Sequence, residues 1–132
     1  MSPDELLDIC TLCEPHPIVP HQYREARKIA GLDVAVNYQF EPRDDTAPIL
    51  IRITISPLFV GKTAEDLWPD YLRVREWIDS NVCQLPEPEL DANHADYDQA
   101  RSARRAFTNT YVMHALVTTR GQTVHFLVLQ RI

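Results

Sequence analysis

Two stretches of the chain alternate between hydrophobic and polar residues, apart from Ala35 and Leu50, which is the pattern of a half-buried β-strand. They span residues 32–40 and 49–55, and the link between them is rich in proline and aspartate, as an exposed loop would be. The hydrophobic positions are Val34, Val36, Tyr38 and Phe40, followed by Ile49, Ile51, Ile53 and Ile55. We therefore predict an antiparallel hairpin over residues 32–57.

The last stretch, residues 106–132, predicts a second hairpin. Arg120-Gly121 fits a two-residue turn, because glycine adopts a positive φ without steric cost. If Thr119 faces Gln122, one face of the hairpin is hydrophobic along most of its length, and we expect it to be the core face. That face comprises Met113, Ala115, Val117, Val124, Phe126 and Val128.

The opposite face of this hairpin is also largely apolar, although it contains two histidines. It comprises Val112, His114, Leu116, His125, Leu127 and Leu129. Such a face is too hydrophobic to be fully solvated. We therefore expect a helix or a partner chain to cover part of it.

Two helices are predicted before the first hairpin. A short one starts at Ser2, whose side chain can cap it, with Pro3 at the first helical position. A second runs over residues 20–30, with Pro20 at its first position and Gly31 as its C-terminal stop.

Two more helices are predicted between the hairpins. Thr63 and Asp66 have the spacing of a capping box, whereas Pro69 predicts a kink or a later start for this helix. Its hydrophobic stripe comprises Leu67, Tyr71, Val74 and Ile78. The other helix covers residues 91–106, which are rich in alanine and begin with the capping residue Asp91.

This order of elements predicts an α+β fold with a mostly antiparallel sheet of about four strands, formed by two hairpins, and with helices packed on one face. We expect one domain over residues 1–132: a helical N-terminal segment (1–31), the first hairpin (32–57), a helical middle (63–106) and the second hairpin (106–132). A chain of 132 residues is long enough to bury a hydrophobic core without disulfides.

The formal net charge of −6 argues against non-specific nucleic-acid binding, which depends on neutralising phosphates with lysine and arginine. The sequence has no run of about 18 apolar residues that could span a bilayer and no signal-peptide pattern. Its cysteine count of three is odd, so we expect a cytoplasmic protein without a disulfide framework. Its size and acidity resemble those of type III secretion chaperones, and no residue is carried over from them.

Cys10, Cys13, His16 and His21 are the one group of potential metal ligands that lie close together in the sequence. Two thiolates at this spacing can chelate zinc, but zinc fingers separate the cysteine pair from the histidine pair by about a dozen residues. His114 and His125 are diagonal neighbours in the predicted register and would need a further ligand. Buried cysteines that act as small hydrophobes are the default interpretation, so no cofactor is expected.

No catalytic triad, paired-carboxylate site or phosphate loop can be assembled from the sequence. We therefore expect a non-enzymatic protein-binding module, such as an adaptor, a secretion chaperone or an inhibitor/immunity protein, that binds another protein or itself as a homodimer. The predicted contacts are Val112, His114, Leu116, His125 and Leu127. The alternative is a small-ligand or metal-binding protein, or an enzyme, that uses the two histidines or the group around Cys10 and Cys13.

Overall fold

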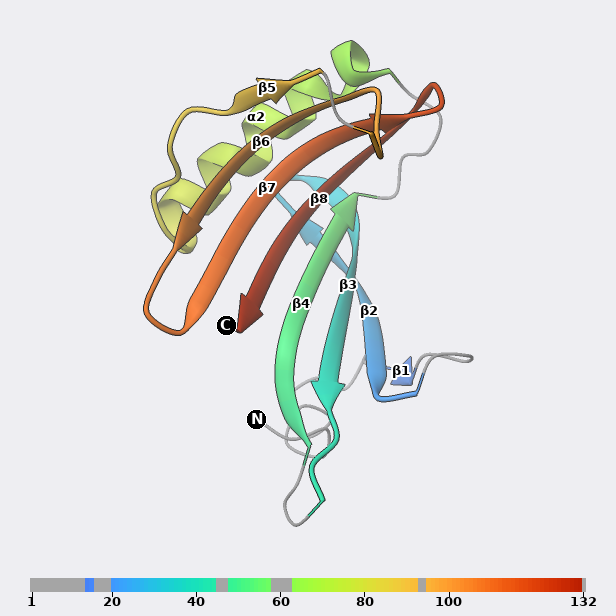
Figure 1. Ribbon diagram of the computed structural model, residues 1–132, viewed down its shortest axis with the longest axis vertical. Helices are drawn as coiled ribbons and strands as arrows, with labels where there is room; N and C mark the ends of the chain where they lie inside the picture. Colours follow the sequence, from blue (N-terminus) through green and yellow to red (C-terminus); the bar gives the residue numbers. More distant parts are fainter. Residues whose placement is uncertain (1–13, 16–19, 45–47, 58–62, 93–94, 132) are drawn as a thin grey trace.

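The structure, a computed structural model, describes residues 14–15, 20–44, 48–57, 63–92 and 95–131 (Figure 1). These residues form one antiparallel sheet and a helix, α2. The elements in chain order are β1 (Glu14–Pro15), β2 (Gln22–Ile29), β3 (Leu32–Glu41), β4 (Ile49–Pro57), α2 (Ala64–Asn81), β5 (Glu89–Asp91), β6 (Gln99–Ala106), β7 (Thr110–Thr119) and β8 (Gln122–Arg131).

The sheet consists of two four-stranded halves joined along β4 and β8. Its strand order is β1-β2-β3-β4-β8-β7-β6-β5, so the strands of each half follow one another in chain order from the edge to the centre. In both halves the outermost strand is the shortest, with two residues in β1 and three in β5. Each half is a β-meander, and the pairing of β4 with β8 makes the sheet continuous.

The predicted fold class is wrong in its number of strands and in its helices. The sheet has eight strands, seven of them with three or more residues, instead of about four. In the described part of the chain, α2 is the one helix, and no set of helices covers a face. The protein is mostly sheet because two segments predicted as helices are strands.

The first of these segments, residues 20–30, contains β2. Ala30 and Gly31 have φ values of 53° and 78°, which is the backbone of a two-residue hairpin turn. A glycine with positive φ serves a helix C-terminus and a hairpin turn equally well, so Gly31 alone could not distinguish them. This segment forms a strand and not a helix because every residue of β2 pairs with a residue of β3.

The second segment, residues 91–106, contains β6. Alanine favours helices, but a difference in propensity of less than about 1 kcal/mol per residue is easily overridden by tertiary contacts. Ala100 and Ala103 are 6% and 2% exposed, and they pair with Val117 and His114 of β7. Their small side chains fit a crowded position in the sheet.

Both predicted hairpins are confirmed. β3 pairs with β4, and β7 pairs with β8 in the predicted register, with Thr119 opposite Gln122 and Val117 opposite Val124. Arg120 and Gly121 have φ values of 53° and 79°, as the two-residue turn requires.

The predicted core face of the second hairpin is the wrong one. Val112, Leu116 and Leu127 are only 1–2% exposed. On the face expected to form the core, Val124 is 53% exposed and Ala115, at 1%, is the one buried member. The helix lies against one face of β7 (Figure 1), and its Tyr71 ring stacks on His114, so the covered face is the one that contains the histidines. Because both faces of this hairpin are apolar, alternation could not decide which one the helix would cover.

The helix α2 follows its sequence pattern. Thr63 caps it with the predicted capping box, in which its hydroxyl accepts from the Asp66 amide. Its buried residues are the four of the predicted stripe. Pro69 lies inside the second turn of a helix that starts at Ala64, so the predicted later start is wrong. The main core, in which Val74 and Ile78 meet residues of β2, β3, β4 and β8, lies under the C-terminal half of α2.

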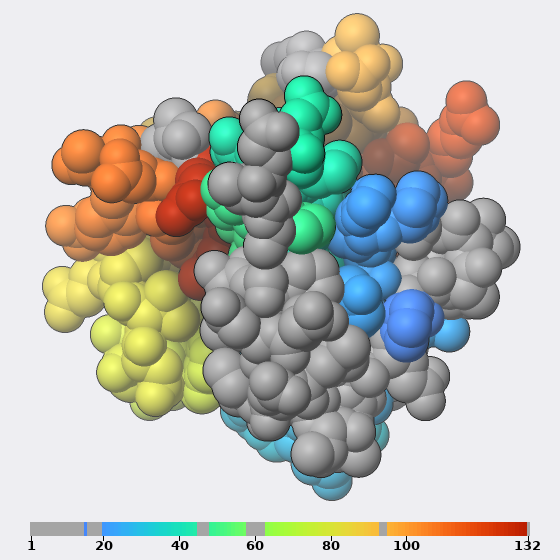
Figure 2. Space-filling model, turned by 90° about the horizontal axis from the view of Figure 1, so that it is seen from below, coloured from blue at the N-terminus to red at the C-terminus, as the bar shows by residue number. Residues whose placement is uncertain are grey.

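Seen from below, β1 and the start of β2 (blue) lie across the molecule from the C-terminal part of α2 (yellow) (Figure 2). The far end of β2 meets α2, because Ile29 packs against Val74 and Ile78. The helix predicted at Ser2 lies outside the described residues, as do Cys10, Cys13 and His16.

Candidate functional sites: a buried histidine pair and an open sheet face

The structure brings the five predicted contact residues together beneath α2. Val112, His114 and Leu116 come from β7, and His125 and Leu127 from β8. All five are 4% exposed or less. They therefore form an interior layer between α2 and the sheet, which we call the covered face.

The two histidines of the covered face form a direct hydrogen bond. Their Nε2 atoms are 2.7 Å apart, and the side chains are 0% and 4% exposed. One Nε2 must carry a hydrogen and the other must offer its lone pair, because two donors cannot share this bond. The bond thus requires the acceptor ring to be neutral, and burial disfavours a charge on the donor ring as well.

This arrangement leaves the other ring nitrogens without partners. A neutral imidazole has a single N–H, so the acceptor ring carries it on Nδ1, and the donor ring has a bare Nδ1. Both Nδ1 atoms are buried, and neither has a hydrogen-bond partner among the residues that the structure describes. An unpaired buried donor or acceptor costs about 1–3 kcal/mol. The packing of the residues around the pair must therefore offset this cost.

Aromatic rings from α2 stack on one side of the histidine pair. Tyr71 stacks on His114 with a centroid distance of 3.8 Å and an interplanar angle of 3°, and its hydroxyl donates to the His114 carbonyl oxygen at 3.1 Å. Trp68 stacks on Tyr71 at 5.0 Å, and the Arg101 guanidinium lies 4.9 Å from the Trp68 ring centroid. A column of flat groups thus runs inward from Arg101 to His125.

Burial makes protonation of both histidines unfavourable. It lowers the pKa of His114 from 6.5 to about 2, with smaller contributions from His125 and the Arg75 guanidinium. Burial also lowers the pKa of His125, to about 4, against the opposing effect of the Asp70 carboxylate. Burial raises the pKa of Tyr71 to about 12, so its hydroxyl stays protonated and remains a donor.

The described residues do not favour a metal centre. No group of three or more histidine, cysteine, aspartate or glutamate side chains in this part of the chain could hold an ion. A metal-bound histidine almost always donates its second ring N–H to an oxygen, and neither Nδ1 of the pair has such a partner. His21 lies far along the sheet from this pair, exposed and with a φ of 62° just before β2.

A second candidate site lies on the opposite side of the sheet, which we call the open face. There β7 and β8 contribute an apolar strip that no described element covers. Val124 is 53% exposed and the other members are partly buried. The apolar strip consists of Met113, Val117, Val124, Phe126 and Val128.

The apolar strip has flanks of opposite charge. On the β2 to β4 side, the residues that point to the open face include Arg24, Lys28 and Arg52, together with Asp33. On the β5 and β6 side they include Glu89, Asp91 and Arg104. The Arg52 Nε is buried and has no hydrogen-bond partner in the described part of the chain, and Arg52 lines a small polar hollow of about 240 Å³.

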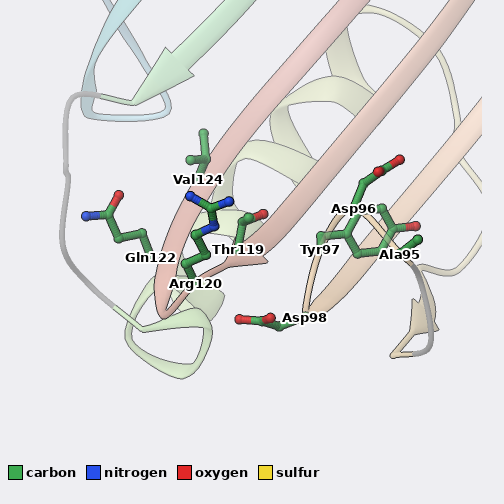
Figure 3. A pocket seen from close by; sticks show the side chains of 8 residues that line it. All are labelled: Ala95, Asp96, Tyr97, Asp98, Thr119, Arg120, Gln122 and Val124. Carbon is green, nitrogen blue, oxygen red and sulfur yellow. The ribbon is translucent and has the colours of Figure 1, made fainter.

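A larger polar hollow borders the apolar strip at the β7–β8 turn (Figure 3). It has a volume of about 820 Å³, and Val124 and Arg120 lie on one side of it while Asp96 and Tyr97 lie on the other. The Gly121 amide donates to the Asp98 carboxylate at 3.3 Å, which ties the turn to the segment before β6. Polar residues therefore border the apolar strip at this end, and the bond between Gly121 and Asp98 fixes the turn in place.

Sequence reasoning found the histidine pair but missed what the pair contacts and which face stays open. The register placed His114 and His125 as diagonal neighbours, and the 2.7 Å bond confirms that their rings converge. The i, i+4 spacing of Leu67 and Tyr71 showed which side of α2 is buried, but not which face of the sheet it meets.

No protein-family model matches this chain, and no curated protein or solved structure matches it either. Among the described residues, the structure contains no helix with the length and apolar character needed to cross a membrane.

Proposed function

We propose that this chain is a non-enzymatic protein-binding module that self-associates through its open face. The observation that carries the proposal is the apolar strip of β7 and β8, which lies on the side of the sheet opposite α2. Val124, at 53% exposure, is its most accessible member. Apolar side chains gathered on a solvated sheet face are a recurrent feature of protein interfaces.

The occupant that fits this face is a second copy of the chain. A two-fold axis that runs parallel to the strands along the β7–β8 hairpin lays β8 of one copy on β7 of the other. The apolar strip then meets itself, as the isologous contact of a two-fold dimer requires. The same rotation keeps each residue at its position along the strands, so it places Glu89 and Asp91 over the part of the partner's β2 that holds Arg24 and Lys28. Charge complementarity of this kind fixes the orientation of an interface.

The predicted contacts on the covered face remain a separate proposal, because they require α2 to move away. The compartment we propose is the cytoplasm. It is supported by the odd count of three cysteines and by Cys83, which is a free thiol.

Sedimentation equilibrium over a range of protein concentrations tests the proposal. We expect a reversible dimer, and we expect Val124→Asp to weaken it at least tenfold, because a two-fold interface contains the substituted residue twice. Leu90→Asp is the matched control, since Leu90 is 58% exposed at the sheet edge and its side chain points to the other face. A chain that stays monomeric at all concentrations, or a dimer that Val124→Asp leaves intact, contradicts the proposal.

A further inference from the structure

We propose that His114 and His125 form an acid-sensitive latch that holds α2 against the sheet and releases it when the pair takes up protons. This regulatory role is independent of self-association, because it concerns the covered face and not the apolar strip.

The position of the pair supports a latch. His114 contacts α2 directly through the stacked Tyr71 ring and through the bond from the Tyr71 hydroxyl to its carbonyl oxygen. His125 is joined to the helix through His114 and through a tilted contact with Tyr71 at 5.5 Å. The hydrogen bond between the rings therefore joins the helix contact to β8.

The chemistry of the pair makes it sensitive to acid. The 2.7 Å contact needs one bare Nε2, so a doubly protonated pair would place two N–H donors against each other. Two charged groups of α2 act on the pair. The Arg75 guanidinium lowers the pKa of His114, whereas the Asp70 carboxylate raises the pKa of His125. From the sheet, the paired neighbours of the two histidines are Ala103, Leu116 and Leu127, none of which can compensate a positive charge.

α2 is the element that would yield. Backbone ladders hold β7 and β8 on both sides, to β6 and to β4. The helix is held to the sheet by side chains: its buried stripe, the Tyr71 hydroxyl and the bond from Arg73 to the Ala30 carbonyl oxygen. Its release would expose Val112, Leu116 and Leu127, which the sequence analysis predicted as contact residues.

Tryptophan fluorescence reports on the helix selectively. The chain has two tryptophans, Trp68 and Trp77, and both lie on α2. We would measure urea unfolding by this signal from pH 7 to pH 5, where aspartate and glutamate remain mostly ionised. For the wild type, the unfolding constant should rise by up to about a hundredfold per pH unit below pH 6.5, since unfolding takes up as many as two protons.

His125→Gln removes one titrating ring and keeps an amide that can pair with His114. We expect its unfolding constant to rise by no more than about tenfold per pH unit from the remaining ring. His21→Asn is the matched control, because His21 is exposed and asparagine tolerates its positive φ of 62°, so it should behave as the wild type. If the unfolding constant depends on pH equally in the wild type and in His125→Gln, the latch proposal is wrong.

Hydrogen exchange distinguishes a latch from a histidine pair that is only part of the core. Between pH 7 and pH 5, after correction for the intrinsic exchange rate, the amides of α2 should lose protection while those of β3 and β4 keep theirs. If all these amides lose protection together, the pair does not control α2 and the proposal fails. Should His125→Gln not fold, histidine ring nitrogen shifts of the wild type decide, since rings that are charged at pH 5.5 while the α2 amides keep their protection contradict the latch.

Discussion

His114 and His125 face each other from β7 and β8 with their Nε2 atoms 2.7 Å apart, in a space that leaves them 0% and 4% exposed. The bond needs one bare Nε2 and is lost when both rings are protonated, and burial lowers the pKa of each ring. The burial that permits the bond also leaves both Nδ1 atoms unpaired. The pair therefore links the stability of the protein to pH.

We predict that the protein loses stability in mild acid. The pKa values of the folded protein, about 2 for His114 and about 4 for His125, lie below the ordinary value of 6.5, so the unfolded chain binds more protons. The stabilisation is fully present above pH 6.5 and is lost as the pH falls towards these values. At pH 5 the loss should reach up to about 4 kcal/mol, from about 1.4 kcal/mol per pH unit for each ring. Urea denaturation at pH 7 and pH 5 measures it, and an unchanged midpoint would contradict the neutral pair.

We predict that Tyr71→Phe lowers the free energy of unfolding by about 1 kcal/mol, because it deletes the hydroxyl bond to the His114 carbonyl oxygen and keeps the stacked ring. Tyr71→Ala also removes the ring, which is 0% exposed, and should cost about 3–5 kcal/mol. Chemical denaturation of both variants measures these losses. Leu72→Ala, at a position that is 47% exposed on the same helix, is the control and should change little.

We predict that Leu116→Asp prevents folding. Leu116 is 2% exposed beneath α2, and an unpaired carboxylate there would cost a large part of the 5–15 kcal/mol that stabilises a typical domain. Far-ultraviolet circular dichroism should show loss of the sheet. Leu90→Asp makes the same chemical change at a position that is 58% exposed, and its spectrum should match that of the wild type. A folded Leu116→Asp variant would mean that the covered face is open in solution.

We predict opposite effects for two substitutions in the β7–β8 turn. Arg120→Asn should stabilise the protein by a few tenths of a kcal/mol, because asparagine tolerates the φ of 53° better than arginine does. Gly121→Ala should destabilise it by about 1 kcal/mol, since its φ is 79° although no atom lies within 4 Å of an added Cβ. Thermal unfolding of both variants measures the difference, and a stabilising Gly121→Ala would contradict the turn geometry.

Local sequence patterns correctly predicted the strands and the helix whose patterns are compatible with only one kind of secondary structure. The β7–β8 register followed from a two-residue turn flanked by alternating residues, and α2 followed from its capping box and stripe. β2 and β6 were predicted as helices because their local signals, a glycine stop and a run of alanines, serve helices and strands alike. Only long-range pairing, of β2 with β3 and of β6 with β7, distinguishes the two structures.

The features of the candidate sites fall into the same two groups, those that the sequence predicted and those that only the tertiary structure decided. The sequence alone placed His114 and His125 within reach of each other, because strand register is a local consequence of the turn between them. It could not determine that Tyr71 stacks on His114, nor that Val124 is exposed while Leu116 is buried. Both follow from the face on which α2 packs, and that choice depends on contacts between residues far apart in the chain. Two apolar faces of one hairpin have nearly the same hydrophobic pattern, so the free-energy difference between covering one or the other arises only in the assembled fold.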